Sequence, residues 1–338
     1  MAADNRLHYF DNVKAALISI VVLGHVFELV VSRKAGVALS FMYMFHMPLF
    51  VFCLGYFAKF NPKKVILNLG GTYLLFQTLF FLLQRFVFGY YSLRLQFTTP
   101  HWVMWFLLAM IIWMLLVPLL DIAATGNKRI AITIGAAFLL GILAGFDDNL
   151  GHFMSLGRVV YFFPFFVLGF CVKKAVDPLE FLHRITHWRI RILTGVPTAL
   201  IFGWLWFNNH LVDIRWLWGV HSYYRLDYTG YNFVVRIMLY IGAMVISLFF
   251  LSVIPVGKMF FSYIGTRTLQ VFLLHGFVVH MLNQWVMRHI PGGFVMLGFT
   301  VAVTAAMVFL FSAWVFVPSE WVKFYRGLWN VNITEVTR

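Results

Sequence analysis

Ten long apolar runs constrain the fold of this chain more than any other feature of its sequence. A helix needs about 20 apolar residues to cross the hydrocarbon core of a bilayer. Within that core, only helices and closed barrels satisfy all of their backbone hydrogen bonds. The sequence therefore predicts an all-α, polytopic membrane bundle of about ten transmembrane helices. The predicted spans are residues 13–31, 39–57, 65–83, 102–120, 130–146, 157–173, 192–207, 236–254, 268–287 and 294–317.

The composition favours one membrane-embedded domain. Charged residues make up 11% of the chain, against about 25% in a typical soluble domain. No polar stretch reaches the length of a domain, so we expect residues 1–338 to form a single integral membrane domain. The net charge of +14 would suggest nucleic acid as the partner of a soluble protein. In a membrane protein, Lys and Arg gather in cytoplasmic loops and at headgroups, so we expect membrane lipids and no nucleic acid as partners.

The distribution of Lys and Arg predicts the orientation of the chain. With ten spans, both termini lie on one side of the membrane, and most of the 26 Lys and Arg residues fall on that side. Because positive residues accumulate on the cytoplasmic side, we expect both termini in the cytoplasm. We expect the membrane to be a bacterial plasma membrane. Lipid-facing and partner-facing apolar surfaces have similar compositions, so the sequence leaves the oligomeric state open.

Ionisable side chains in the first span form the most informative polar pattern. Lys14 and His25 are eleven residues apart, which in a helix is about 1100°, or three turns plus about 20°. Both side chains therefore lie on one face, about 16 Å apart along the axis. Asp11 and Glu28 each lie three residues from one member of this pair. Ionisable groups at membrane depth are costly and mark function, although Lys14 also suits a headgroup anchor and Glu28 a headgroup-level carboxylate.

This pattern suits proton transfer beside an anionic substrate. A neutral imidazole at His25 can take a proton from a hydroxyl group. A carboxylate, from Glu28 or Asp11, can orient the ring and stabilise its protonated form. Lys14 is predicted to gather with Lys63 and Lys64 at the cytoplasmic entrance. Their positive charge there suits the phosphates of an anionic donor.

Four further residues are predicted to bind substrate in the outer half of the membrane. His46 shares the depth of His25, whereas Trp105 and Arg158 begin spans that enter from outside, and His275 lies in the middle of the ninth span. Other interpretations also fit these residues. A Trp at this depth can be an interfacial anchor, a buried Arg can belong to an ion pair, and a His can join two helices by a hydrogen bond.

Five sequence blocks, in order, carry a resemblance to a known family. They are Lys14-x10-His25, FHMPLFVFCLGYF at 45–57, WFLLAM at 105–110, the GR…FFPFFVLGF stretch at 157–170 and IGTRTLQVFLLHGF at 264–277. In these blocks the chain resembles the acyltransferase-3 family of integral membrane acyltransferases, and it is most similar to the fucose 4-O-acetylase-like branch. The number of predicted spans is also similar to that of the family.

The resemblance implies transfer of an acyl group, with acetyl expected, from cytoplasmic acyl-coenzyme A to a hydroxyl of a sugar or cell-envelope glycan. It implies that His25 is the catalytic residue and general base, and that Lys14 contacts the donor. Direct attack on the thioester and a route through an acyl-imidazole both fit. Two departures stand out. Lys14 replaces the commoner Arg, and Lys63-Lys64 stands where some members have an Arg-x-x-Arg pair.

A transporter or flippase is the main alternative, because intramembrane charges also form proton relays and substrate paths. The sequence contains no internal repeat of the kind that many transporters have. The His residues lack the compact spacing of zinc sites, so we expect no metal. The donor substrate that the resemblance implies is acetyl-coenzyme A.

Overall fold

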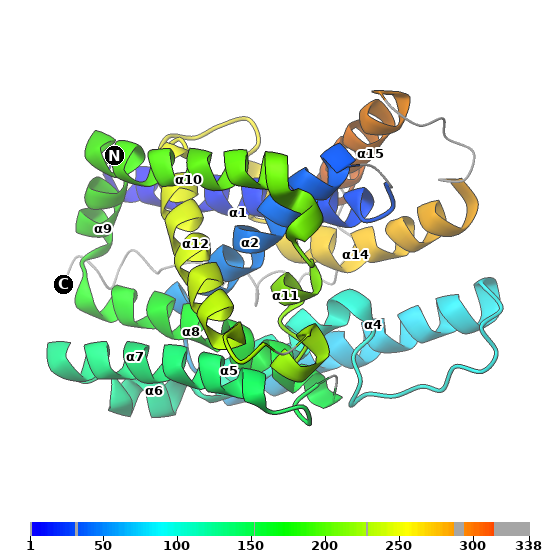
Figure 1. Ribbon diagram of the computed structural model, residues 1–338, viewed down its shortest axis with the longest axis horizontal. Helices are drawn as coiled ribbons and strands as arrows, with labels where there is room; N and C mark the ends of the chain where they lie inside the picture. Colours follow the sequence, from blue (N-terminus) through cyan, green and yellow to red (C-terminus); the bar gives the residue numbers. More distant parts are fainter. Residues whose placement is uncertain (1, 31–32, 152, 228, 287–293, 314–338) are drawn as a thin grey trace. The chain divides into compact units, whose positions relative to one another are not determined.

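The computed structural model describes residues 2–30, 33–151, 153–227, 229–286 and 294–313 (Figure 1). These residues form helices, turns and loops, and they contain no strand. The chain divides into two compact units. The first unit comprises Met1–Phe50, Val176–Asp213 and Ile241–Arg338, and the second comprises Val51–Ala175 and Ile214–Tyr240.

The described residues confirm an all-α membrane bundle. Eight helices are long and apolar enough to cross a membrane, and a pair bent by 46°, Trp102–Leu115 with Val117–Ala123, brings the number to nine if it forms one span. The predicted count of ten and the predicted side of the termini stay predictions. Residues 314–338, which include the end of the tenth predicted span and the C-terminus, lie outside the described residues.

The first unit is built on the N-terminal helix, α1. Within this unit, α1 packs against α13, α14 and α15, and α14 packs against α15. The first part of α2 and the second part of α12 also belong to this unit. Its helices are α1 (Ala2–Phe27), α2 (Arg33–Tyr56), α9 (Pro178–Ile185), α10 (Trp188–Asn208), α12 (Asn232–Val253), α13 (Ser262–Gly265), α14 (Thr268–Met281) and α15 (Phe294–Ala313).

The buried side-chain amide of Asn12 binds α1 to the loop between α12 and α13. The Asn12 side chain donates hydrogen bonds to the carbonyls of Pro255 and Gly257, both at 2.8 Å, and accepts one from the Ser262 hydroxyl at 2.6 Å. A Cβ at Gly265 would overlap the backbone of α1 at Asp11. Only glycine therefore lets α13 approach this turn of α1, where the ionisable pattern begins.

Side chains at the start of α14 donate hydrogen bonds to carbonyl groups of α15. Gln270 donates to the carbonyl of Phe311 at 2.5 Å, and Arg267 donates to those of Ser312 and Ala313. These bonds hold α14, and with it the middle of the predicted ninth span, against a neighbouring helix of the same unit.

The second unit contains the helices that carry the other predicted site residues. The last part of α2 and the first part of α12 belong to it. Its remaining α-helices are α3 (Pro62–Lys64), α4 (Gly71–Leu82), α5 (Trp105–Leu115), α6 (Val117–Ala123), α7 (Asn127–Leu143), α8 (Leu156–Ala175) and α11 (Arg215–Trp218).

Two glycines let α8 pack closely against the end of α2 within this second unit. A Cβ at Gly55 would overlap the carbonyl group of Phe166, and a Cβ at Gly169 would overlap that of Phe52. Small residues at such contacts are typical of helices that pack in membranes, where van der Waals contact replaces the hydrophobic effect. The two glycines belong to the sequence blocks at 45–57 and 157–170.

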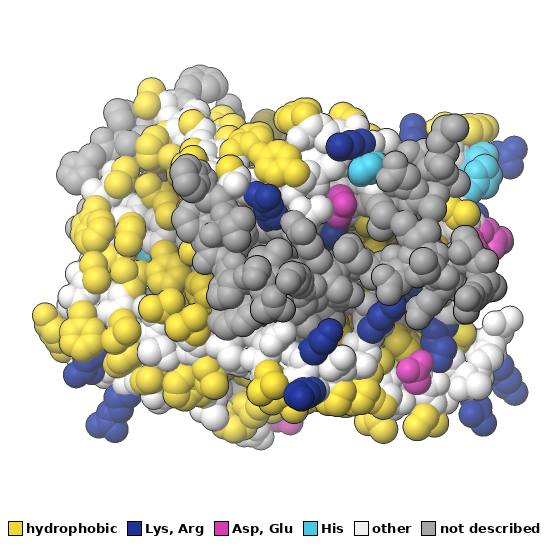
Figure 2. All heavy atoms as spheres, turned by 180° about the vertical axis from the view of Figure 1, so that it is seen from behind, with side chains coloured by type: hydrophobic (Ala, Val, Ile, Leu, Met, Phe, Trp, Pro, Cys, Tyr) yellow, Lys and Arg dark blue, Asp and Glu magenta, His cyan; other side chains and the backbone are white. Residues whose placement is uncertain are grey.

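The outer surface carries much apolar area, as expected of helices that face lipid. Exposed large hydrophobic side chains occur along most of the long helices, among them Leu139, Leu193 and Met238. Figure 2 shows hydrophobic side chains spread over the visible face, whereas Asp and Glu appear only at isolated positions. A soluble protein rarely exposes contiguous apolar area on this scale.

Candidate functional site

The site is built at the end of α1, where His25 lies beside Glu28. The helix ends at Phe27. In the turn that follows, the Leu29 amide donates a hydrogen bond to the Val26 carbonyl and the Val30 amide donates one to the Phe27 carbonyl, so each bond spans three residues and the turn is tighter than an α-helix. This turn brings a Glu28 carboxylate oxygen to 3.3 Å from Nδ1 of His25. The His25 side chain is 15% exposed, so the pair is shielded but not sealed from a substrate.

The partners of His25 determine which ring nitrogen carries the proton. A carboxylate only accepts hydrogen bonds, so Nδ1 of His25 is the donor to Glu28. In the neutral ring, Nε2 is then the nitrogen with a lone pair, the atom that can accept a proton. Glu28 therefore orients the ring and can stabilise its protonated form, in the manner of the carboxylate in a catalytic triad.

A tyrosine that the sequence analysis missed completes this arrangement. The hydroxyl group of Tyr43 on α2 donates a short hydrogen bond to the other carboxylate oxygen of Glu28. The same hydroxyl lies 3.3 Å from Nδ1 of His25. Tyr43 is largely buried, so its hydroxyl contacts both members of the pair from within the protein. A search for polar residues one helical turn before His46 would have found it, since the two are three residues apart.

His46 lies behind this tyrosine in the core. Its Nδ1 is 2.6 Å from the carbonyl oxygen of Met42, one turn earlier in α2, and its ring meets the ring of Tyr43 edge-on at a centroid distance of 4.9 Å. The side chain is buried. Because the carbonyl accepts, Nδ1 carries the proton and the ring orientation of His46 is determined by its own helix.

His275 of α14 packs directly on the proposed catalytic ring. The rings of His25 and His275 stack with centroids 5.4 Å apart and planes inclined by 21°. His275 is fully buried, and its Nδ1 lies 3.2 Å from the carbonyl of Val271. The structure therefore brings together four of the residues singled out from the sequence, His25, Glu28, His46 and His275, and Tyr43 contacts the first three.

Lys14 forms a separate ion pair three turns before His25. Its ammonium nitrogen lies 2.7 Å from a carboxylate oxygen of Asp11, and the Lys14 side chain is only 4% exposed. Asp11 therefore lies against Lys14 and not against His25, from which it is about 21 Å away along the axis of α1. Burial strengthens the attraction between the two charges and makes an unpaired lysine here costly.

In the second unit, the structure brings Trp105 and Arg158 together. The guanidinium carbon of Arg158 lies 5.1 Å from the ring centroid of Trp105, which is the geometry of a cation–π contact. The Nε of Arg158 also donates to the carbonyl of Trp218 at 3.2 Å. Trp105 stacks on Phe162 at a centroid distance of 5.4 Å. The aromatic residue at the start of α5 is thus held by the first turns of α8.

The backbone before each of these two helices is strained. Trp102, with φ of +36°, precedes α5, and Met154 and Ser155, with φ of +48° and +52°, precede α8. Non-glycine residues rarely adopt positive φ, and those that do cluster at functional sites. The Met154 amide donates to the carbonyl of Thr98 at 2.6 Å, which ties the segment before α8 to the loop that leads to Trp102.

Lys63 and Lys64 lie in α3, at the start of the candidate span Pro62–Val87 in the same unit, and both are exposed. The side chain of Asn61 caps this helix by accepting from the Lys64 amide at 3.1 Å. Over the described part of the chain, no group of three or more His, Cys, Asp or Glu side chains is arranged to hold a metal ion. Cys53 and Cys171 are free, buried thiols.

Comparison with known proteins identifies the family. The family model described as an acyltransferase domain, acyltransferase-3, matches residues 7–317. No curated protein and no solved structure matches the chain. The matched region contains every site residue described above, from Asp11 to His275. The chain therefore belongs to the acyltransferase-3 family of membrane acyltransferases.

Proposed function

We propose that the protein transfers an acyl group, most simply acetyl, from acyl-coenzyme A to a hydroxyl of a sugar or cell-envelope glycan, with His25 as general base. The observation that carries this proposal is the contact of the His25 ring with Glu28 at 3.3 Å, which directs Nε2 toward proton uptake. Membership of an acyltransferase family accounts for the acyl chemistry. The imidazole and its carboxylate account for activation of a hydroxyl.

In the direct route, Nε2 of His25 takes the proton of the acceptor hydroxyl as its oxygen attacks the thioester carbonyl. The carbon–sulfur bond then breaks, and the departing thiolate takes the proton back from the imidazolium. The products are an ester and free coenzyme A. In the alternative route, Nε2 attacks the thioester first, the carbon–sulfur bond breaks and coenzyme A leaves as its thiolate. The acyl-imidazolium then passes its acyl group to the acceptor oxygen, and the hydroxyl proton neutralises the thiolate. Glu28 stabilises the positive ring in both routes.

The donor and acceptor residues follow from charge and chemistry. Lys14, Lys63 and Lys64 are assigned to the phosphates of the donor, because Lys acts on phosphate as a point charge. Lys63 and Lys64 are exposed, whereas Lys14 is buried against Asp11 and would exchange that partner for a phosphate. His46, Trp105, Arg158 and His275 stay the residues proposed for the acceptor, as the sequence predicted. An Arg beside an aromatic ring suits a sugar that carries an acidic group. We place the enzyme in the bacterial plasma membrane with cytoplasmic termini.

The experiment is binding and turnover of acetyl-coenzyme A by the detergent-solubilised protein with a panel of sugar and glycan acceptors. His25→Ala is expected to lower transfer by about 10²–10⁴-fold while donor binding is kept. Lys14→Gln is expected to weaken donor binding. His210→Ala, which changes an exposed histidine of the same unit, is the matched control.

Two outcomes contradict the proposal. Full transfer by a folded His25→Ala variant would show that His25 is not the general base. Substrate flux in vesicles without any binding of acetyl-coenzyme A favours a transporter instead. Radiolabelled acetyl-coenzyme A without acceptor separates the two routes, because only an acyl-imidazole leaves label on the protein and His25→Ala abolishes that label.

A further inference from the structure

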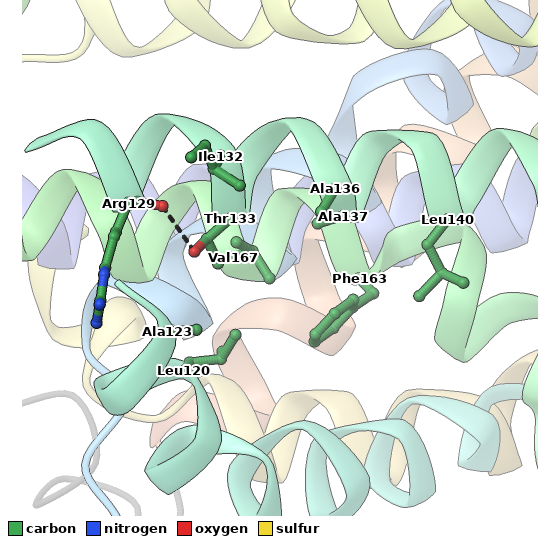
Figure 3. Close-up of a pocket in the computed structure, with 10 residues that line it drawn as sticks. All are labelled: Leu120, Ala123, Arg129, Ile132, Thr133, Ala136, Ala137, Leu140, Phe163 and Val167. Carbon is green, nitrogen blue, oxygen red and sulfur yellow. Dashed lines mark hydrogen bonds between the residues drawn. The ribbon is translucent and has the colours of Figure 1, made fainter. Parts of the chain in front are cut away.

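An open groove runs along α7 in the second unit. Its volume is about 400 Å³, within the range of small-molecule sites. Figure 3 shows its lining side chains, which come from α6, α7 and α8. Almost all of them are apolar, including Leu120, Ile132, Ala136, Leu140 and Phe163.

The groove has one charged lining residue among those the structure describes, and it lies at one end. Arg129 is in the first turn of α7, whereas Leu140 lies at the opposite end of the row (Figure 3). The Arg129 side chain is exposed and makes no hydrogen bond or ion pair with another described residue. Thr133, the other polar lining residue, donates its hydroxyl to the Arg129 carbonyl at 2.8 Å. The guanidinium is therefore the group available to an anion.

The length of the groove matches one leaflet of a bilayer. Arg129 and Leu140 are eleven residues apart on one helix, or about 16 Å at 1.5 Å per residue. Half of a hydrocarbon core of about 30 Å is close to this length. Only 17% of the most apolar window of the span Asn127–Phe146 is buried inside the protein, so this helix is among those most open to lipid.

The acidic residue that follows Leu120 on α6 does not oppose an anion in the groove. Asp121 follows the lining residue Leu120 on α6. Its carboxylate accepts a hydrogen bond from the Lys174 ammonium at 3.0 Å, and its carbonyl accepts another at 3.1 Å. This ion pair neutralises the acid, while Arg129 and its neighbour Lys128 add positive charge at the same end of α7.

We infer that this groove binds an anionic phospholipid, with one acyl chain along α7 and the headgroup phosphate on Arg129. The apolar lining suits the chain, and the guanidinium matches a phosphate with paired, charge-assisted hydrogen bonds. A lipid without net charge would gain the chain contacts but less from Arg129. The site uses none of the residues assigned to acyl transfer, so it stands or falls independently of that activity.

The test is native mass spectrometry of the purified full chain titrated with dioleoyl phosphatidylglycerol or dioleoyl phosphatidylcholine. The wild type is expected to bind the anionic lipid more tightly. Arg129→Gln is expected to weaken that binding about tenfold, as for loss of a hydrogen bond to a charged group. Lys128→Gln removes the same charge one residue away, outside the lining, and is expected to change it little. Ala136→Phe, at an exposed lining position, is expected to displace both lipids.

Three results would overturn the inference. One is equal affinity of the wild type for the two lipids. A second is equal weakening by Arg129→Gln and Lys128→Gln, which shows unspecific attraction by the end of α7. The third is displacement of the lipid by glycerol 3-phosphate alone, which makes a soluble phosphate the occupant. Thermal unfolding of each variant confirms that it is folded before binding is compared.

Discussion

The imidazole rings of His25 and His275 lie stacked, with centroids 5.4 Å apart and planes inclined by 21°. The first ring is partly accessible and the second is fully buried. His275 also lies against Phe272 at a centroid distance of 5.8 Å. A buried, packed ring thus forms the support on which the accessible ring rests, which limits the directions in which Nε2 of His25 can point.

We first predict that the flat ring at position 275 matters more than its nitrogen atoms. His275→Leu is expected to lower kcat for acyl transfer by about 10–100-fold, because a small misorientation of a catalytic group has effects of this size. His275→Phe keeps a flat ring and is expected to retain more of kcat. The measurement is steady-state kinetics with KM for the donor as the internal reference. Equal rates for both variants and the wild type contradict a supporting role.

The second prediction concerns the hydroxyl of Tyr43, which donates to Glu28 and lies 3.3 Å from His25. Tyr43→Phe is expected to lower kcat about tenfold or more and to leave donor binding unchanged, because Glu28 loses the bond that holds it beside the ring. Tyr9→Phe is the matched control. Its buried hydroxyl donates to the Leu251 carbonyl at 2.8 Å in the same unit, away from His25.

Tyr9→Phe loses a bond to a neutral carbonyl and is expected to lose about 1 kcal/mol of stability, whereas Tyr43→Phe loses a bond to a carboxylate and is expected to lose about 1.5–3 kcal/mol. Only Tyr43→Phe is expected to lose turnover. A parallel loss of activity in both, or none in either, would show that Tyr43 has only a structural role.

The third prediction concerns close helix packing at Gly169. Gly169→Ala is expected to lower the unfolding temperature, because the added methyl group overlaps the Phe52 carbonyl and forces α2 and α8 apart. Gly135→Ala is the matched control on α7, where no atom lies within 4 Å of an added Cβ. That change is expected to be neutral or stabilising, because Ala has the higher helix propensity. Thermal unfolding in detergent measures both, and equal melting temperatures contradict the packing argument.

The fourth prediction concerns pH and the loop that contains α11. Asp148 accepts two hydrogen bonds from Arg225, at 2.6 and 3.2 Å, and one from Ser222 at 2.6 Å. The bonds from Arg225, and after them the bond from Ser222, lower the pKa of the Asp148 carboxyl group. Its stabilising contribution is therefore fully present above the ordinary pKa of 3.8 and is lost as the pH falls through the lowered value.

Asp148→Asn should accordingly melt below the wild type at about pH 7, and the difference between the two proteins should shrink toward about pH 3. Because the carboxylate is exposed, the difference is expected to be small and to decrease with added salt. A difference that does not change with pH would show that the hydrogen bonds act without the charge.

Local patterns in the sequence were enough to predict the parts of the molecule that depend on one helix. Apolar runs predicted an all-α membrane bundle, because backbone groups in lipid must be satisfied within the segment. Helical spacing predicted that Glu28 would lie near His25 and that Asp11 would lie near Lys14, since residues three apart share a face. The five blocks identified the family that the match over residues 7–317 confirms.

Contacts between distant segments were beyond these patterns. Spacing along α1 left Asp11 and Glu28 as alternative partners of His25, and the paired Lys14 and the turn after Phe27 distinguished them. Nothing in the local sequence of Tyr43 indicated that its hydroxyl would reach Glu28. The cation–π contact of Arg158 with Trp105 likewise joins helices some fifty residues apart.

The sequence by itself thus determined that this chain is a helical membrane acyltransferase with ionisable groups along its first helix, because hydropathy and helical periodicity are local properties. The tertiary structure decided that the ring of His275 stacks on His25 and that Tyr43 donates to the carboxylate of Glu28. It also decided at which glycines a neighbouring backbone comes close. Those choices depend on how helices far apart in the chain pack, and side chains at such contacts show no period that a sequence can reveal.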